Sequence, residues 1–117
     1  MTRDQRGAAT AELALGIPLL VSLTVGLVWL LAVGEAQVRV VDAARETARA
    51  AARGDAEAEA IARGEQVAPG ARVTVVARDG EVVSTASDSV APPGGLLSFL
   101  PAAHVHARAV TAAEESP

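Results

Sequence analysis

The sequence lacks cysteine, lysine and tyrosine, and its only aromatic residues are Trp29 and Phe99. Without cysteine there are no disulfides, thiol nucleophiles or cysteine metal sites. Arginine supplies every basic side chain, and no basic block or stacking platform for bases is present, which argues against nucleic-acid binding. Outside one long apolar run, the small Ala- and Val-rich side chains can bury only a thin core.

That apolar run is Leu13–Gly34, 22 residues without a charge. As a helix it is long enough to cross a bilayer core of about 30 Å. A cleavable secretory signal would be shorter and end in a small-residue site, which GEAQ matches poorly. A buried helix would need a larger surrounding protein. We therefore predict a transmembrane helix over residues 8–34, and Arg3 and Arg6 place its N-terminal end in the cytoplasm.

Two features inside the span affect its shape. Pro18 removes one backbone donor and frees the carbonyl of Ala14, so a mild kink is expected there. Ser22 and Gly26 lie one helical turn apart. They would let another helix approach closely, or they are small residues simply tolerated in the helix.

Residues 35–66 read as a helical stalk. From Glu35 to Arg53 there is no helix breaker, so one helix from about Ala8 to Arg53 is predicted. Glu35–Arg39 and Glu46–Arg49 are spaced for ion pairs on its surface. Gly54 would stop it, and Asp55 would cap a short second helix ending at Gly64. The stalk's apolar stripe, at spacings of three and four, is Val38, Val41, Ala44, Ala48 and Ala51.

Residues 67–113 read as a small β-rich head. The runs 71–78 and 81–90 are β-branched and are joined by Asp79-Gly80, a strong hairpin signal. Residues 104–112 alternate as a third strand, and 114–117 should be a disordered tail. The predicted fold is α+β: a long transmembrane and stalk helix, a short helix, and an antiparallel sheet of about three strands. The loop Leu96–Leu100 either covers the thin head core or contacts another subunit.

Few residues suggest chemistry. His104 and His106 share a strand face, but no third metal ligand accompanies them. Ser89, Asp88 and a histidine could be combined into a hydrolytic triad, yet no nucleophile elbow surrounds the serine. The glycines form neither a phosphate loop nor a dinucleotide fingerprint. We expect no enzyme activity, cofactor, metal or small-molecule substrate.

The N-terminus is more informative. A short charged leader ends in Gly7, four small residues follow, and then comes Glu12, ahead of an apolar span with an early proline. This arrangement resembles the processing site of type IV prepilins. The resemblance implies that a prepilin peptidase removes residues 1–7 by cutting between Gly7 and Ala8. The new amine of Ala8 could then pair with Glu12 of a neighbouring subunit. A helix-start carboxylate, or an interfacial charge without a partner, are the alternative readings of Glu12.

The first half of the chain also resembles the TadE-like family of pilus-assembly proteins. The shared elements are Gly7, Glu12, Ala14, Pro18 and the stalk segment 43–49, which contains Ala44, Arg45, Glu46 and Arg49. Members often have Phe where this chain has Leu13. The resemblance implies a minor pilin or pseudopilin of a tight-adherence (Tad) system that builds a Flp-type IVb pilus, with an extracytoplasmic head.

The partners implied are the membrane, a prepilin peptidase, other pilin-like subunits and the Tad assembly platform. Two other readings remain open: a single-pass anchored interaction module that keeps its leader, and a secreted binding domain cut near Ala36. Whether the protein enters the pilus shaft, its tip or only the platform is left open by the sequence, as are its direct partner subunit and whether the head folds alone.

Overall fold

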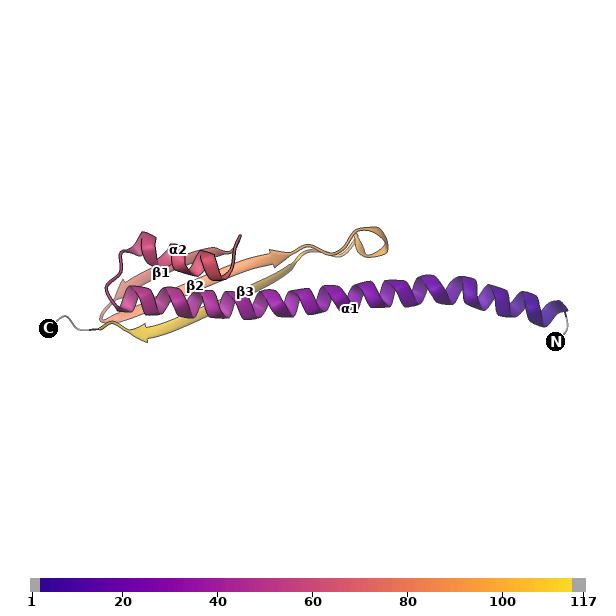
Figure 1. Ribbon diagram of the computed structural model, residues 1–117, viewed down its shortest axis with the longest axis horizontal. Coiled ribbons are helices and arrows are strands. Elements are labelled where there is room, and N and C mark those ends of the chain that lie inside the picture. The colour runs from indigo at the N-terminus through magenta and orange to yellow at the C-terminus, as the bar shows by residue number, and fades with distance from the viewer. Residues whose placement is uncertain (1–2, 115–117) are drawn as a thin grey trace.

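The computed structural model describes residues 3–114, apart from the side chain of Leu96. The molecule is a rod of 87 × 20 × 19 Å with the head packed along one half of a single long helix (Figure 1). Its elements in chain order are α1 (Arg3–Ala52), α2 (Glu57–Val67), β1 (Arg72–Arg78), β2 (Glu81–Val90), the 3-10 turn η1 (Gly95–Leu97) and β3 (Ala103–Ala112). The predicted α+β fold class is confirmed.

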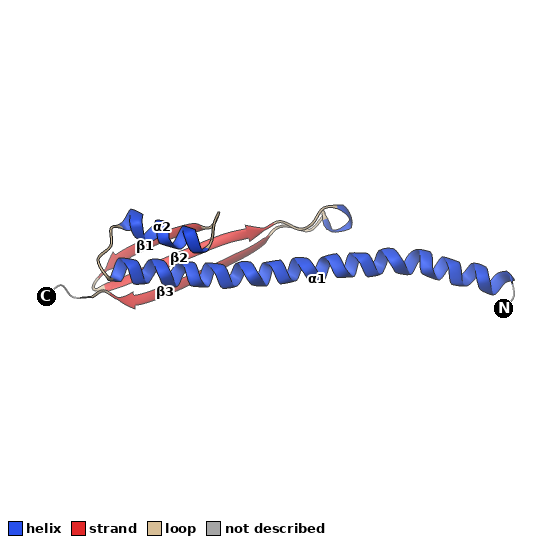
Figure 2. Cartoon of the chain, viewed as in Figure 1, coloured by secondary structure: helices blue, strands red, loops and turns tan. Residues whose placement is uncertain are grey.

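α1 is one continuous helix that carries both the apolar run and the stalk (Figure 2). It passes through Pro18 without ending, because the proline removes only one hydrogen bond from a long ladder. The helix begins at Arg3 and not near Ala8 as predicted, so Gly7 and the leader residues from Arg3 onward are helical as well. The residues before Arg3 lie outside the described part of the chain.

The second helix corrects two expectations. It does not stop at Gly64 but continues to Val67. Asp55 does not cap it, since the N-cap residue is Ala56 and no side chain bonds there. Instead the Asp55 carboxylate lies 3.1 Å from Arg53 and 3.6 Å from Arg63, both of which are charged partners that outcompete a neutral amide.

The sheet has the order β1-β2-β3 and is antiparallel throughout. Arg78 pairs with Glu81 across a two-residue turn. Asp79 and Gly80 in that turn have φ of 53° and 78°. This is the geometry that Asp-Gly favours, because both central residues of such a hairpin turn need positive φ. The predicted strands and hairpin are therefore confirmed.

The core of the head lies between the C-terminal half of α1, the sheet and α2. The strand face with Val82, Ser84 and Ala86 turns towards α1, and Val105 of β3 joins it. The predicted stalk stripe is only partly right: Val38 is 60% exposed and the first fully buried residue is Val40. Because α2 and the sheet cover different sides of α1, the buried arc is wider than one stripe. It comprises Val40, Ala43, Ala44, Thr47, Ala48, Ala50 and Ala52.

At the far end of the head, the residues after β3 are hydrogen-bonded to the end of α1 and to the β1–β2 turn. The backbone N–H of Glu114 donates to the carbonyl of Ala52 at 3.0 Å, and that of Ala113 donates to Gly80 at 2.8 Å. Glu114, the first residue of the expected disordered tail, is thus tied to α1. Residues 115–117 lie outside the described part of the chain.

Candidate anchoring and assembly surfaces

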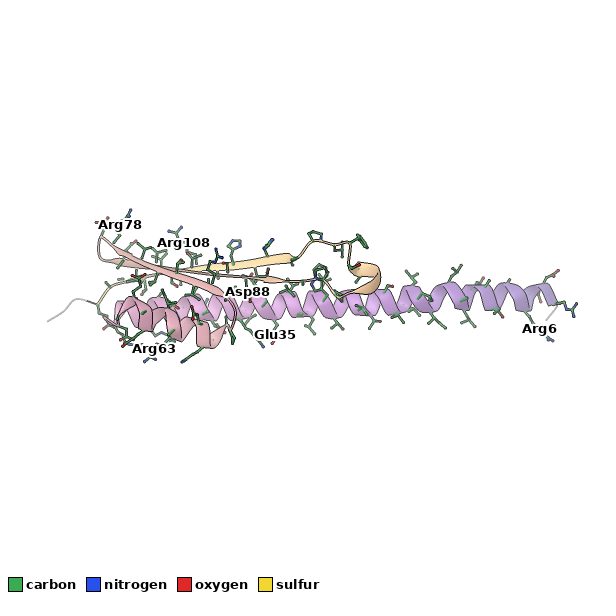
Figure 3. The ribbon with its side chains drawn as sticks, turned by 90° about the horizontal axis from the view of Figure 1, so that it is seen from above. Arg6, Glu35, Arg63, Arg78, Asp88 and Arg108 are labelled. Atoms are coloured by element: carbon green, nitrogen blue, oxygen red, sulfur yellow. The ribbon has the colours of Figure 1, made fainter. Side chains whose placement is uncertain are left out.

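The N-terminal half of α1 is an uncovered apolar surface. An 18-residue window of it is apolar enough to cross a membrane, and none of that window is buried in the molecule. A core helix of a soluble protein would be covered, so this one needs an apolar environment from outside. Side chains project from it along its length, with Arg6 at the tip (Figure 3). The exposed large residues are Leu13, Leu15, Ile17, Leu19, Leu20, Val21, Leu23, Leu27, Val28, Leu30 and Leu31.

The predicted cleavage and pairing residues lie on the first turns of this surface. Gly7, Ala8 and Glu12 are all exposed. A methyl group added at Gly7 would meet no atom within 4 Å. Ala8 and Glu12 are four residues apart in α1, one turn of helix, and within the described residues Glu12 forms no ion pair. The carboxylate is thus presented outward, at the edge of the apolar stretch.

The stalk segment 43–49 divides by face. Ala44 and Ala48 are buried against the head, while Arg45 and Arg49 are exposed. Small side chains on the buried face let the sheet and α2 approach the helix axis closely. The alanines and arginines of this segment therefore have distinct roles, packing on one side and surface charge on the other.

Glu46 connects the two helices. Its carboxylate lies 3.4 Å from Arg49 on the same helix and 3.9 Å from Arg63 on α2. Arg63 in turn reaches Asp55, which also holds Arg53. The five charges form an ion-pair chain across the α1–α2 contact. Separately, Arg39 pairs with Glu35 one turn apart, as predicted.

α1 and α2 approach each other closely at Gly64. A Cβ built on Gly64 of α2 would lie 2.1 Å from the Thr47 hydroxyl and 3.2 Å from the Ala43 carbonyl oxygen. Only glycine fits there. Gly64 was predicted to end the helix, and neither this contact nor the ion pairs of Arg63 were predicted, although a glycine within a helix-forming stretch is a signal for close packing.

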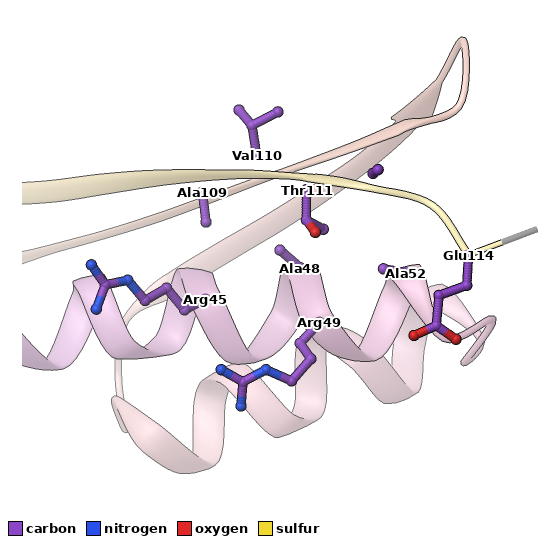
Figure 4. Close-up of a pocket in the computed structure, with 9 residues that line it drawn as sticks. Arg45, Ala48, Arg49, Ala52, Ala109, Val110, Thr111 and Glu114 are labelled. Atoms are coloured by element: carbon purple, nitrogen blue, oxygen red, sulfur yellow. The ribbon is translucent and has the colours of Figure 1, made fainter.

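A shallow pocket opens between α1 and β3. Arg45 and Arg49 line it on the helix side, Thr111 and Ala109 on the strand side, and Glu114 stands at its end (Figure 4). No nucleophile with an adjacent base lines it. Among the described residues, no group of three His, Cys, Asp or Glu side chains could hold a metal ion.

The hydrolytic triad considered from the sequence, Ser89, Asp88 and a histidine, is not assembled, because these side chains lie on opposite faces of the sheet. Ser89 pairs with His104, and Ser87 pairs with His106, which places these residues on the outer face. Strand alternation sends Asp88 to the opposite face. Its carboxylate accepts the Ser89 backbone N–H at 2.8 Å instead of orienting a histidine.

An exposed, membrane-length helix that continues without a break into a small α+β head is the architecture of a membrane-anchored protein. The family comparison agrees with this class. Residues 7–49 match the model of the family described as TadE-like protein. The match covers the predicted cleavage site, the span and the stalk motif, and it confirms the resemblance to the TadE-like family over those residues.

A search of curated proteins finds a relative in Mycobacterium tuberculosis (strain ATCC 25618 / H37Rv) named "Apoptosis inhibitor Rv3655c". The two are 46% identical over 79 residues, which cover 67% of this chain and 57% of the relative. The match thus spans just over half of the relative's length. No solved structure matches the chain.

Proposed function

We propose that the protein is a minor pilin or pseudopilin of a Tad system, processed by a prepilin peptidase after Gly7. The observation that carries the proposal is the spacing of Gly7 and Glu12 directly ahead of an uncovered apolar helix. The sheet and α2 pack on the other half of α1, and the loop after β2 touches the span near Gly26, so the rest of the span's surface is open to the helices of like subunits.

The predicted cleavage site is helical in the structure, which affects how a peptidase could reach it. A peptidase needs an extended strand, so the first turns of α1 would unwind before the cut. Glycine costs about 1 kcal/mol in a helix relative to alanine. Gly7 therefore weakens the helix at the bond to be cut, and the fraying first turns of α1 lower the cost further.

Mass spectrometry of the protein extracted from membranes of its host tests this step. The proposal expects a mature chain that starts at Ala8 in wild type and an intact leader in Gly7→Ala. A matched control, Gly16→Ala, changes a helical glycine that likewise has open space around it and should leave processing intact. A wild-type N-terminus other than Ala8 would rule the proposal out.

Glu12 is assigned to assembly. An unpaired charge within the bilayer centre costs about 2.5–3.5 kcal/mol, and less near the interface. In a bundle of subunits, the Ala8 amine of one chain would neutralise Glu12 of the next and fix their register. Glu12→Ala should be inserted and processed normally but recovered less with pilin-like subunits. Glu35→Ala, which removes a carboxylate at the other end of the span, is the control. Equal recovery of Glu12→Ala and wild type would remove the pairing role.

The alternative is an anchored extracytoplasmic interaction module that keeps its leader. The exposed arginines of the stalk and the open pocket between α1 and β3 favour it as binding surfaces. It expects Met1 or Thr2 at the N-terminus and no effect of Gly7→Ala, so the same mass measurement separates the two.

A further inference from the structure

One reading of the sequence expected the loop between β2 and β3 to cover the core of the head. In the structure the loop lies elsewhere. It extends along α1 beyond the sheet, towards the apolar end of the molecule (Figure 1). Leu97 lies against Gly26, where an added Cβ would be 3.6 Å from its Cδ1 atom. Val21, Ser22 and Val25 line a small apolar pocket together with Gly94, Gly95 and Leu97. The loop thus occupies the small-residue face of the span that another helix could have used.

The contact is deep within the apolar run. Gly26 lies about 12 Å before Gly34 at 1.5 Å per residue. The half-thickness of a bilayer core is about 15 Å. If the run spans the membrane, the tip of the loop is level with the interior of the leaflet on the head's side.

We propose that residues 91–102 insert into this leaflet, with lipid acyl chains covering the loop's outer surface. The inference rests on membrane anchoring and not on the pilin role. Phe99, one of only two aromatic residues, is 77% exposed, so most of its ring is left uncovered by the described chain. Between Asp88 and Arg108 the sequence contains no acidic residue and no arginine.

The boundary between charged and uncharged residues lies at the same level along the long axis on α1 and on the β2–β3 hairpin. Gln37 of α1 donates to the His106 carbonyl at 3.0 Å, which aligns the two elements. Asp88 pairs with Val105, one residue closer to the loop. Asp88 and Glu35 consequently lie at nearly the same level along the long axis (Figure 3). Both are the last acidic groups before uncharged segments, so one plane separates charged from apolar residues on both elements.

Some of the loop's polar groups are hydrogen-bonded within the loop, which lowers the cost of placing them in lipid. The Ser98 hydroxyl donates to the Gly95 carbonyl at 2.7 Å, and the Leu100 backbone N–H donates to Leu97 at 3.1 Å. Pro92, Pro93 and Pro101 have no N–H to satisfy. In the span itself, Thr24 likewise donates its hydroxyl to Leu20 at 2.9 Å.

The absence of cysteine allows a direct test in the full chain. Single Phe99→Cys, Ala91→Cys and Val110→Cys variants, all at exposed positions, would carry an NBD fluorophore in phosphatidylcholine vesicles. Quenching by nitroxides on the lipid acyl chains is compared with quenching by aqueous Co²⁺. Val110 is the matched control, an exposed apolar residue on β3 in the head.

The proposal expects the label at residue 99 to be quenched several-fold more by acyl-chain nitroxide than by Co²⁺. The label at 110 should show the reverse and the label at 91 an intermediate ratio. Equal Co²⁺ quenching at 99 and 110 would place the loop in water and overturn the proposal. Protection of residue 99 from both quenchers would also overturn it, because protein from a second copy would then cover the loop. Neither result depends on whether Gly7 is the cleavage site.

Discussion

Replacement of Gly64 by alanine tests the packing that holds the head on its helix. The added Cβ would lie 2.1 Å from Thr47 Oγ1 and 3.2 Å from both the Ala43 carbonyl oxygen and Val73 Cγ1. The Ala43 oxygen is backbone and cannot move independently of α1, and the Val73 side chain is packed in the buried core of the head. α2 would therefore have to shift off α1.

The magnitude follows from two opposed effects. Alanine is favoured over glycine inside a helix by about 1 kcal/mol. Overpacking a tight contact costs about 1–3 kcal/mol, and the 2.1 Å approach puts Gly64 at the upper end. We expect Gly64→Ala to lower the free energy of unfolding by about 2 kcal/mol. Urea unfolding in a mild detergent, followed by far-UV circular dichroism, would measure it.

A double-mutant cycle isolates the cause. Thr47→Ala removes the closest atom, and it also removes a buried hydroxyl that has no hydrogen-bond partner among the described residues. Gly64→Ala should therefore cost less in the Thr47→Ala background than in wild type. Gly34→Ala, where the Cβ meets no atom within 4 Å, should not destabilise. A Gly64→Ala protein as stable as wild type, or an equal loss of stability in both backgrounds, would show that this contact is not tight.

Three further outcomes are expected by the same unfolding measurement. Ser84→Ala should raise the free energy of unfolding by about 1 kcal/mol, because the Ser84 hydroxyl is fully buried and has no hydrogen-bond partner within residues 3–114. A loss of stability would show that the hydroxyl is satisfied. Glu46→Ala should lower the free energy of unfolding by less than about 1 kcal/mol, because the ion-pair chain is partly exposed. High salt should abolish this loss. A loss that does not depend on salt would indicate packing instead. Gly80→Ala should cost about 1 kcal/mol because φ there is 78°, and Gly16→Ala, with ordinary φ, should not.

Local signals in the sequence account for most of the fold. The charge-free run, the unbroken stalk and the Asp79-Gly80 turn each specify their element through neighbouring residues alone, and all three appear as expected. The stalk motif was likewise visible as alternating alanines and charges. These features depend on spacing within one element, which a single sequence displays directly.

What could not be predicted depends on contacts between elements. The exposure of Val38 and the burial of Val40 follow from where the hairpin begins to cover α1, which no helical period reveals. Asp55 was expected to cap α2, but its carboxylate pairs with Arg63 instead. Arg63 lies eight residues later in α2, and the sequence around Asp55 does not reveal this contact. The position of the Leu96–Leu100 loop depends on the lengths of β2 and β3 relative to the apolar run.

The continuity of α1 has a mechanical consequence. No joint separates the membrane segment from the helix that forms one wall of the head, so the two move as a lever. Membrane helices tilt by about 20° on average, and such a tilt would swing the far end of an 87 Å rod sideways by roughly 30 Å. A rotation of α1 within a bundle would likewise carry the sheet around the axis with it. Small changes in the tilt or rotation of packed transmembrane helices would thus produce larger displacements at the distal end of the head.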